Sequence, residues 1–404
     1  MKIVILGGGI SGLSAAWYLR KKHPDAKITL IEKQGRLGGC IQSTRTEGFF
    51  FEKGPRTFMA SRSQFLLDLI EEVGLKNDLI FSQSAKRYLW HQGKLRGVSS
   101  FLPMLLPALV REPFIAKKVS EDESIYDFAS RRFGPKIAET LFDPMALGVF
   151  AGNIRDLSLR SCFPVLHEWE QKKGSVVWGM LFRRKKKTVS GLFTLRHGIG
   201  SLVDAIAKKV PVEIHVNCPV EAIRPEGVEA GGKFWSADRI ISALPGLEIG
   251  RLTQSWVDFP AQSLWVVSFA FPENSLQKRG FGYLVPSQEK EALLGAIWDS
   301  SVFPQQNLRN EVRLTAMVRD QGDATWAVAI ARGAFHRHLG IQAEPLYVCP
   351  HYALDAIPQF EVGYGKRLVR FREEIKQKVP NLSLVGNYID GASVDSCIRT
   401  AKRL

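Results

Sequence analysis

A glycine-rich stretch at the start of the chain has the residue types and the spacing needed to bind a phosphate group. Gly7, Gly9 and Gly12 follow directly on the apolar run at 2–6. Glycines at this spacing turn a buried parallel strand tightly into a helix, whose free N–H groups can hold a pyrophosphate. A Cβ atom at Gly7 or Gly9 would obstruct that approach. Because the pattern alone is a weak signal, its value depends on the elements around it.

The elements expected around this stretch form a complete βαβ unit. Small and apolar residues predict a helix over 13–22, and a second strand is expected over 27–31. Glu32 ends that strand, twenty residues past Gly12, where an acid bonds the hydroxyl groups of an adenosine ribose. The unit therefore predicts a dinucleotide site for an unphosphorylated ribose.

The composition is that of a globular protein with more than one domain. The chain has 404 residues, of which 45% are hydrophobic, so it can bury a large core. Its five cysteines show neither metal-ligand spacing nor a paired framework, which suits a reducing compartment. No signal peptide precedes the first strand, and no apolar run reaches the roughly 20 residues that span a bilayer. We therefore expect a cytoplasmic protein that is soluble or lies on a membrane surface.

The charge balance favours an anionic partner. There are 55 Lys and Arg residues against 40 Asp and Glu residues, which gives a net charge of +15. Such a charge suits nucleic acid, acidic lipid or a substrate with several carboxylates. The basic residues are dispersed, which argues against nucleic acid. The one dense basic run, at 183–187, adjoins Trp178, Leu181 and Phe182 and also suits an anionic membrane surface.

Two further segments near the N-terminus resemble a known family. Residues 35–39 read GRLGG, and a strand expected over 48–53 leads into the Gly-Pro turn at 54–55. This combination resembles the flavin amine oxidase superfamily, in which both segments line FAD. The residues that the resemblance and the glycine-rich unit together assign to the cofactor are Gly7, Gly8, Gly9, Ile10, Ser11, Gly12, Glu32, Lys33, Arg36, Gly38, Gly39, Cys40, Gly54, Pro55, Arg56 and Thr57.

The segment at 381–398 resembles the second half of that cofactor site. A strand followed by a helix that starts near Ser393 would offer N–H groups and a positive dipole end to the flavin ring and ribityl chain. The resemblance also implies that Val220 meets the adenine through its backbone. We expect non-covalent FAD, because Cys40 and Cys397 lie outside the pattern that attaches flavin in monoamine oxidases. The residues assigned to this half are Val220, Gly386, Gly391, Ala392, Ser393 and Val394.

Segments in the middle of the chain resemble the substrate site of one branch, the oxygen-dependent protoporphyrinogen oxidases. The Lys-Arg-Tyr segment at 86–88 resembles the one whose arginine, here Arg87, anchors a substrate propionate. The segment at 281–287 resembles the one that presents Leu284 to the tetrapyrrole, and the same alignment adds Ile297 and Met317. These residues would form an apolar slot with a cationic rim, which suits a flat apolar ring that carries carboxylates.

The fold class expected is α/β, with two insertions in a cofactor domain. Strands within 212–245 return to a Rossmann-like FAD-binding domain of the glutathione-reductase and amine-oxidase type. Alternating segments within 265–318 predict an antiparallel-sheet substrate domain, and helices at 125–133 and 136–149 belong to a helical membrane-contact domain. The expected boundaries are 1–83 with 194–250 and 340–404 for the discontinuous FAD-binding domain, 84–98 with 251–339 for the substrate domain, and 99–193 for the helical domain.

The apolar segment at 99–119 has two alternative interpretations. It has basic flanks, and it is too short and too interrupted by Pro103 and Pro107 to span a bilayer. It is either an interfacial membrane segment or a buried helical core. The resemblance favours membrane contact, because the family docks by a helical domain in this region. We therefore expect a cytoplasmic protein with peripheral membrane association.

The resemblance covers nearly the whole chain and implies a reaction. It implies six-electron oxidation of protoporphyrinogen IX to protoporphyrin IX in haem biosynthesis, with molecular oxygen as acceptor and hydrogen peroxide as product. FAD supplies the redox chemistry. We assign no certain catalytic side chain, because a pyrrole N–H can lose the proton itself, and no metal, because the sequence shows no cluster of metal ligands. The product would pass to a porphyrin-metallating enzyme.

Two alternatives to this reaction stay open. The substrate could be coproporphyrinogen III, which has four propionates instead of two and would give coproporphyrin III. From another class of protein, the Rab GDP-dissociation inhibitors share the architecture and act as binding proteins without flavin. They need no C-terminal flavin segment, so the residues at 386–394 argue against that class.

Overall fold

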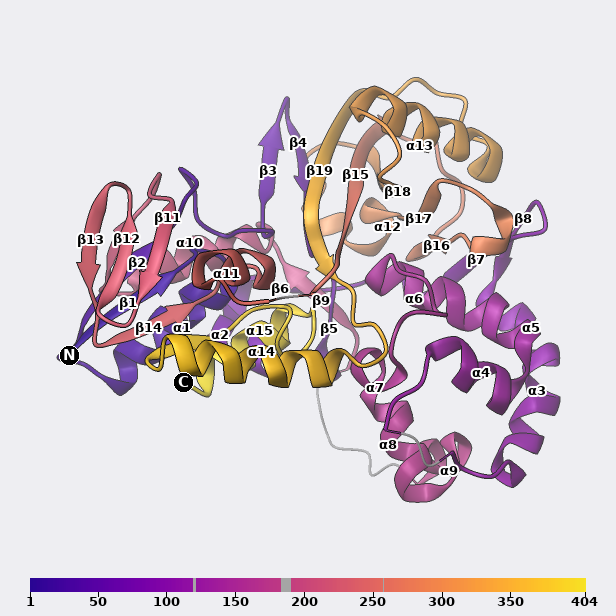
Figure 1. Ribbon diagram of the computed structural model, residues 1–404. Helices are drawn as coiled ribbons and strands as arrows, with labels where there is room; N and C mark the ends of the chain where they lie inside the picture. The colour runs from indigo at the N-terminus through magenta and orange to yellow at the C-terminus, as the bar shows by residue number, and fades with distance from the viewer. Residues whose placement is uncertain (119–120, 183–189, 257) are drawn as a thin grey trace.

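The computed structural model of the protein describes residues 1–118, 121–182, 190–256 and 258–404. Three groups of elements lie side by side in Figure 1: a parallel sheet near both termini, a larger sheet at the upper right, and a set of helices at the lower right. The basic run at 183–187 lies outside the described residues.

The first group is built on a five-stranded parallel sheet with the order β10-β2-β1-β14-β20. Its strands come from three distant parts of the chain. They are β1 (Lys2–Leu6), β2 (Lys27–Ile31), β10 (Glu213–His215), β14 (Arg239–Ser242) and β20 (Leu382–Leu384). The central strand is buried on both faces: Ile3 and Ile5 pack in one apolar cluster, and Val4 and Leu6 pack in another. A near-continuous apolar run is typical of such a strand.

Helices and a small sheet cover the two faces of the parallel sheet. One face packs against α1 (Ile10–Lys22), α2 (Gln64–Glu72), α10 (Gly200–Lys209) and α15 (Val394–Lys402). The other packs against α11 (Gly246–Thr253), α14 (Tyr364–Lys378) and the antiparallel strands β11 (Val220–Arg224), β12 (Gly227–Ala230) and β13 (Lys233–Ser236). Five short strands form two further small sheets, one of two strands and one of three. They are β3 (Ser43–Thr46) with β4 (Phe49–Glu52), and β5 (Phe58–Met59), β9 (Leu192–Leu195) and β6 (Leu79–Phe81).

The second group is a seven-stranded sheet with the order β19-β15-β18-β17-β16-β7-β8. Its strands are β7 (Arg87–His91), β8 (Lys94–Gly97), β15 (Ala261–Pro272), β16 (Gly282–Leu284), β17 (Leu293–Ile297), β18 (Glu311–Arg319) and β19 (Tyr347–Pro358). All neighbours are antiparallel except β7 and β16. The strands expected within 265–318 are confirmed. The helix α13 (Ala324–Leu339) packs on one face, against Leu314, Ala316 and Val318 of β18.

One strand of this sheet was not expected from the sequence. The strand β19 pairs with β15 along most of its length, although its residues fall in the range assigned to the cofactor domain. The division of the chain into domains stays a prediction. Because β19 (Tyr347–Pro358) pairs with β15, that prediction must count these residues with the substrate sheet.

The third group consists of short helices. The helix expected over 125–133 is confirmed as α4, whereas a π-helical turn at Ala138–Phe142 interrupts the one expected over 136–149. Among the described residues, no helix combines the length and the apolar character needed to cross a bilayer. The elements are α3 (Leu102–Arg111), the turn η4 (Glu112–Phe114), α4 (Ile125–Phe133), α5 (Pro135–Ile137), α6 (Asp143–Phe150), α7 (Leu159–Cys162), α8 (Pro164–Lys173) and α9 (Val176–Leu181).

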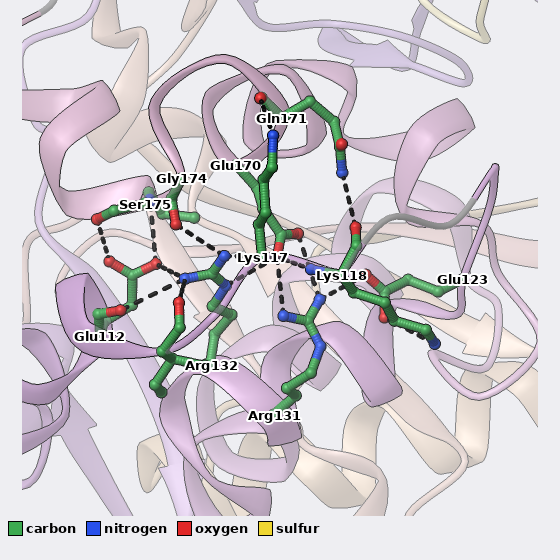
Figure 2. A network of polar contacts seen from close by, with 12 residues as sticks. Glu112, Lys117, Lys118, Glu123, Arg131, Arg132, Glu170, Gln171, Gly174 and Ser175 are labelled. Atoms are coloured by element: carbon green, nitrogen blue, oxygen red, sulfur yellow. Dashed lines mark hydrogen bonds and ion pairs between the residues drawn. The ribbon is translucent and has the colours of Figure 1, made fainter.

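A buried ionic network holds the helical group together (Figure 2). The side chain of Arg132 on α4 is fully buried, and its guanidinium lies 3.0 Å from the Glu112 carboxylate and 2.5 Å from that of Glu170. It also donates to the carbonyl oxygens of Ile115, at 3.0 Å, and Gly174, at 2.9 Å. One side chain therefore joins α4 to the η4 turn and to α8.

Candidate functional site

The glycine-rich loop joins β1 to α1 in a conformation that requires glycine. Gly7 has φ +96°, in the left-handed region, and its N–H donates to the carbonyl oxygen of Ile31 at 2.8 Å. A Cβ atom on Gly12 would lie 1.9 Å from the carbonyl oxygen of Gly7. The close approach of the first turn of α1 to this loop therefore excludes any side chain at Gly12.

Glu32 lies at the end of β2, as the sequence predicts, and its side chain is buried. Its two carboxylate oxygens accept hydrogen bonds from the N–H groups of Gly8, at 2.7 Å, and Gln34, at 2.8 Å. The N–H of Cys218 donates to the carbonyl oxygen of Glu32 at 2.9 Å, which brings the start of β11 and Val220 close to this acid. The neighbouring Lys33 is exposed.

The segment at 35–39 lies directly on the glycine-rich loop. The N–H of Gly38 donates to the carbonyl oxygen of Gly8 at 2.8 Å, and Arg36 donates from Nη2 to the carbonyl oxygen of Gly39 at 2.9 Å. The Gly-Pro turn lies next to this segment, since a Cβ atom on Gly54 would be 1.9 Å from the carbonyl oxygen of Cys40. The structure therefore brings together the two N-terminal segments that resemble flavin-lining segments.

The C-terminal helix α15 packs along α1. Its N-cap is Ser393, whose hydroxyl accepts a hydrogen bond from the N–H of Ser396 at 3.1 Å. Burial raises the pKa of the Cys397 thiol to about 11, and a hydrogen bond with Ser11 opposes that rise. Because Ser11 is in the first turn of α1, this contact places the first turns of the two helices together. Gly391, just before the cap, has φ +116°.

Two buried polar atoms in the turn after β4 fit a polar ligand. Arg56 is buried, and it donates to the carbonyl oxygen of Glu52 at 2.7 Å and to the Asp299 carboxylate at 3.2 Å. Its Nε atom and the hydroxyl of Thr57 are buried without a partner among the described residues. Buried polar groups are nearly always hydrogen-bonded, so these atoms and the glycine-lined loop fit a large polar cofactor.

Glu52, whose backbone carbonyl oxygen accepts a hydrogen bond from Arg56, also has a carboxyl group with a raised pKa. Burial raises the pKa of Glu52 to about 7, although its carboxylate accepts hydrogen bonds from the Ile199 N–H and the Ser43 hydroxyl, both at 2.8 Å. Sequence reasoning did not find Glu52 or Asp299, because Glu52 on β4 contacts the start of α10, and Asp299 on the helix α12 (Asp299–Val302) contacts the turn after β4. These segments are far apart in sequence.

The four residues expected to bind substrate lie on one face of the seven-stranded sheet. Arg87 and Ile297 flank the same residue of β16, and Leu284 and Met317 flank the same residue of β17. Cross-strand neighbours share a face, and this face lies opposite α13. Arg87 is exposed, with its guanidinium 5.2 Å from the centre of the Phe281 ring.

The apolar members of this set have different neighbours. Ile297 packs beside Val302 and Phe303, and Met317 packs beside Leu147 of α6. Leu284 contacts the same helix, where a Cβ atom on Gly148 would lie 2.8 Å from Leu284 Cδ2. Sequence reasoning missed the contribution of α6, and a glycine inside a helical segment is the signal that could have indicated this close contact.

This arrangement defines a class of protein. A parallel sheet with a glycine-rich turn, an acid at the end of the second strand and an inserted substrate sheet is the architecture of a dinucleotide-dependent oxidoreductase. The family model described as flavin containing amine oxidoreductase matches residues 10–404. The chain therefore belongs to this family, and it is an FAD-dependent oxidase.

Relatives with known names match along nearly the whole chain. A protoporphyrinogen oxidase from Bos taurus is 30% identical, over 99% of this chain and 97% of the relative. A coproporphyrinogen III oxidase from Bacillus subtilis is 26% identical, over 99% of this chain and 96% of the relative. The crystal structure of a candidate protoporphyrinogen oxidase from Exiguobacterium sp. 255-15 has a TM-score of 0.88 and 25% identity, with 100% of this chain and 97% of that one covered. These similarities favour the enzyme over the non-catalytic alternative, whereas the roles of individual residues stay predictions.

Proposed function

We propose that this protein oxidises protoporphyrinogen IX to protoporphyrin IX in haem biosynthesis, with oxygen as acceptor and hydrogen peroxide as product. The observation that carries the proposal is the sheet face that bears Arg87 together with the apolar residues Leu284 and Met317. A cationic group at the rim of an apolar surface suits a flat ring with carboxylates. The names of the relatives support the same substrate class.

The residues of the chain position the substrate, and FAD, when bound, accepts the hydride. The glycine-rich loop, Glu32 and the first turn of α15 would hold the cofactor. Arg87 would hold a propionate, while Leu284 and Met317 would contact the ring. The four residues assigned to the substrate include no general base, so the proton would leave from a pyrrole N–H. Three rounds of two-electron transfer to three oxygen molecules balance the six-electron oxidation and yield three molecules of hydrogen peroxide.

Anaerobic mixing with reduced porphyrinogens tests the proposed reaction. We expect protoporphyrinogen IX to bleach the visible absorbance of the flavin, and readmitted oxygen to restore it with formation of hydrogen peroxide. Bleaching by coproporphyrinogen III alone would select the second candidate, which the coproporphyrinogen III oxidases among the relatives favour. A holoenzyme that neither porphyrinogen bleaches would contradict the proposal.

Replacing Arg87 with alanine should weaken substrate binding without loss of cofactor. Losing a hydrogen bond to a charged group costs about 1.5–3 kcal/mol, so KM should rise roughly tenfold or more. The matched control is Arg332→Ala, which removes an arginine from α13 on the opposite face of the same sheet. Steady-state kinetics and the flavin content of both variants provide the measurement. An unchanged KM in Arg87→Ala would remove the role assigned to Arg87.

We also propose that the helical group contacts an anionic membrane. Leu102, Leu106, Val110 and Phe114 recur every four residues along α3 and η4, and their exposed fractions are 49%, 51%, 71% and 85%. Residues four apart share one helix face. The helix α9 packs against η4 and adds the exposed Phe182 just beyond its end. For the described residues 99–118, this exposed face supports the interfacial interpretation over the buried core.

Replacing Val110 and Phe114 together with serine should weaken binding to vesicles that contain anionic lipid. Burial of a large apolar side chain contributes about 1.5–3 kcal/mol, so the partition coefficient should fall at least tenfold. The control is Phe234→Ser with Val369→Ser, a matched pair of exposed residues on β13 and α14. Co-sedimentation with vesicles measures the effect. Equal losses in the two double variants would contradict a role for this face.

A further inference from the structure

Strand β4 of the cofactor part packs on β19, the edge strand of the seven-stranded sheet (Figure 1). Phe49 and Phe51 of β4 both stack on Tyr347 of β19, with ring centres 5.9 Å apart in each pair. A backbone hydrogen bond of 2.9 Å extends the pairing of β4 with β3 to Lys53. Because side chains alternate along a strand, Lys53 continues the row of Phe49 and Phe51, and His351 continues the row of Tyr347. Lys53 and His351 therefore lie at the same end of this contact.

The titration of two side chains on β19 shows that Lys53 is close to them. Burial lowers the pKa of His351, and the charges of Lys53 and Arg36 lower it further. Burial raises the pKa of the Cys349 thiol, and the charge of Lys53 opposes that rise. The imidazole of His351 is therefore neutral near pH 7, and the positive charge at this point belongs to Lys53 and Arg36.

These two cations have no acidic partner in the part of the chain that the structure describes. Lys53 and Arg36 are both only partly exposed, and Arg36 donates hydrogen bonds to the carbonyl oxygens of Leu37, at 3.3 Å, and Gly39, at 2.9 Å. Partly buried charges are normally paired. The site therefore suits a ligand that is an anion or becomes one.

The cations lie between the predicted cofactor segments and the predicted substrate face. Lys53 directly precedes the Gly-Pro turn, and Arg36 belongs to the segment that lies on the glycine-rich loop. The strand registers place His351 beside Val266 of β15, and Val266 beside Met317 of β18. His351 is thus about 10 Å from Met317, on the same face of the sheet. A molecule that reacts with the flavin after the substrate has the two cations within reach at this junction.

We propose that Lys53, together with Arg36, stabilises the negative charge that molecular oxygen acquires when it reoxidises the flavin. This inference rests on the proposed function and deepens it, because it assigns residues to the half of the reaction that uses oxygen. Oxygen takes two electrons and one proton from the reduced cofactor and a second proton from solvent, which gives hydrogen peroxide and the oxidised cofactor. The first electron makes oxygen an anion, and a fixed cation lowers the barrier where such charge develops.

Stopped-flow reoxidation of the holoenzyme tests this role, after light and a sacrificial donor have reduced the flavin without any porphyrinogen. Lys53→Met should lower the second-order rate constant with oxygen about tenfold or more, and Lys53→Arg, which keeps the charge, should recover most of it. Reoxidation by ferricenium should not slow in Lys53→Met, because this cation becomes neutral and no negative charge develops. The control Lys208→Met removes an exposed lysine from α10 and should leave both rate constants within about twofold.

The reduction potential of the flavin provides an equilibrium measurement of the same charge. A nearby cation stabilises the negative charge that the cofactor gains on reduction. The potential should therefore shift to a more negative value in Lys53→Met and stay unchanged in Lys208→Met. Such a shift alone would speed reoxidation, so a slower reaction with oxygen cannot come from the driving force.

The outcomes separate this inference from the function on which it rests. A wild-type holoenzyme that ferricenium reoxidises and oxygen does not would overturn the proposed oxygen chemistry together with this inference. Reoxidation of Lys53→Met by oxygen at the wild-type rate, or equal slowing with both oxidants, would overturn the role of Lys53 alone. Loss of flavin from Lys53→Met would assign Lys53 to cofactor binding and overturn the same role.

Discussion

Replacing Gly12 with alanine is expected to give a protein that purifies without FAD. The added Cβ atom would lie 1.9 Å from the carbonyl oxygen of Gly7, and this neighbour is backbone that cannot rotate away. Inserting a methyl group into a packed position costs about 1–3 kcal/mol even where side chains can adjust. Here the loop itself must move, and its N–H groups are the ones that would face the pyrophosphate.

The matched control for Gly12 is another helical glycine. A Cβ atom on Gly365, in α14, would meet nothing within 4 Å, so Gly365→Ala should keep the flavin. The ratio of visible flavin absorbance to protein absorbance compares the two variants directly. Full flavin content in Gly12→Ala would show that the loop relaxes and would contradict the predicted cofactor geometry.

Replacing Arg132 with methionine should destabilise the helical group by about 3–5 kcal/mol. The substitution leaves Glu112 and Glu170 buried without their shared cation, and both carboxylate side chains are fully buried. It also removes the donors to the carbonyl oxygens of Ile115 and Gly174. Breaking a buried ion pair from one side costs more than the pair itself contributes, because a buried charge stays uncompensated.

The neighbouring Arg131 offers a matched control on the same helix. Arg131 also contacts Glu170, at 2.8 Å, but its side chain is 24% exposed. Arg131→Met should therefore cause a clearly smaller loss, since water reaches this position. Hydrogen exchange of α4 and α8 measures the free energy of local opening. Equal losses in the two variants would contradict the central role of Arg132.

The same network predicts a dependence on pH. Burial alone would raise the pKa of Glu170, but hydrogen bonds from Arg131 and Arg132 outweigh it and lower the pKa below its ordinary value of 4.5. A carboxyl group with a lowered pKa in the folded state contributes stability that is present above 4.5 and is lost as the pH falls below it. The protection of α8 against exchange should therefore decrease on acidification in the wild-type protein.

The glycine-rich loop and its acid could be predicted because their chemistry is encoded within one short unit. Gly12 and Glu32 take their positions from a single strand, helix and strand in succession, so local patterns are enough. The second half of the cofactor site follows only from the family resemblance, because α15 packs on α1 from the other end of the chain.

The remaining features depend on tertiary contacts that local patterns do not carry. Along β19 only the last residue is buried, so the strand shows no apolar alternation and forms by pairing with β15. The burial of Arg132 and the ion pair between Arg56 and Asp299 both require elements that meet only in the folded protein. The sequence shows that these residues are charged, but it does not show which residues pair with each other.

The order of the strands in the parallel sheet has a consequence for biosynthesis. The strand β20 and the helix α15 follow both insertions in the chain, yet β20 completes the parallel sheet and α15 belongs to the predicted cofactor site, both of which begin in the first βαβ unit. Domains generally fold from the N-terminus during synthesis. The first βαβ unit is therefore synthesised well before β20 and α15, because the helical group and most of the substrate sheet are synthesised between them. If α15 forms part of the FAD site as predicted, flavin loading would be a late step in the maturation of the enzyme, after these inserted parts have left the ribosome.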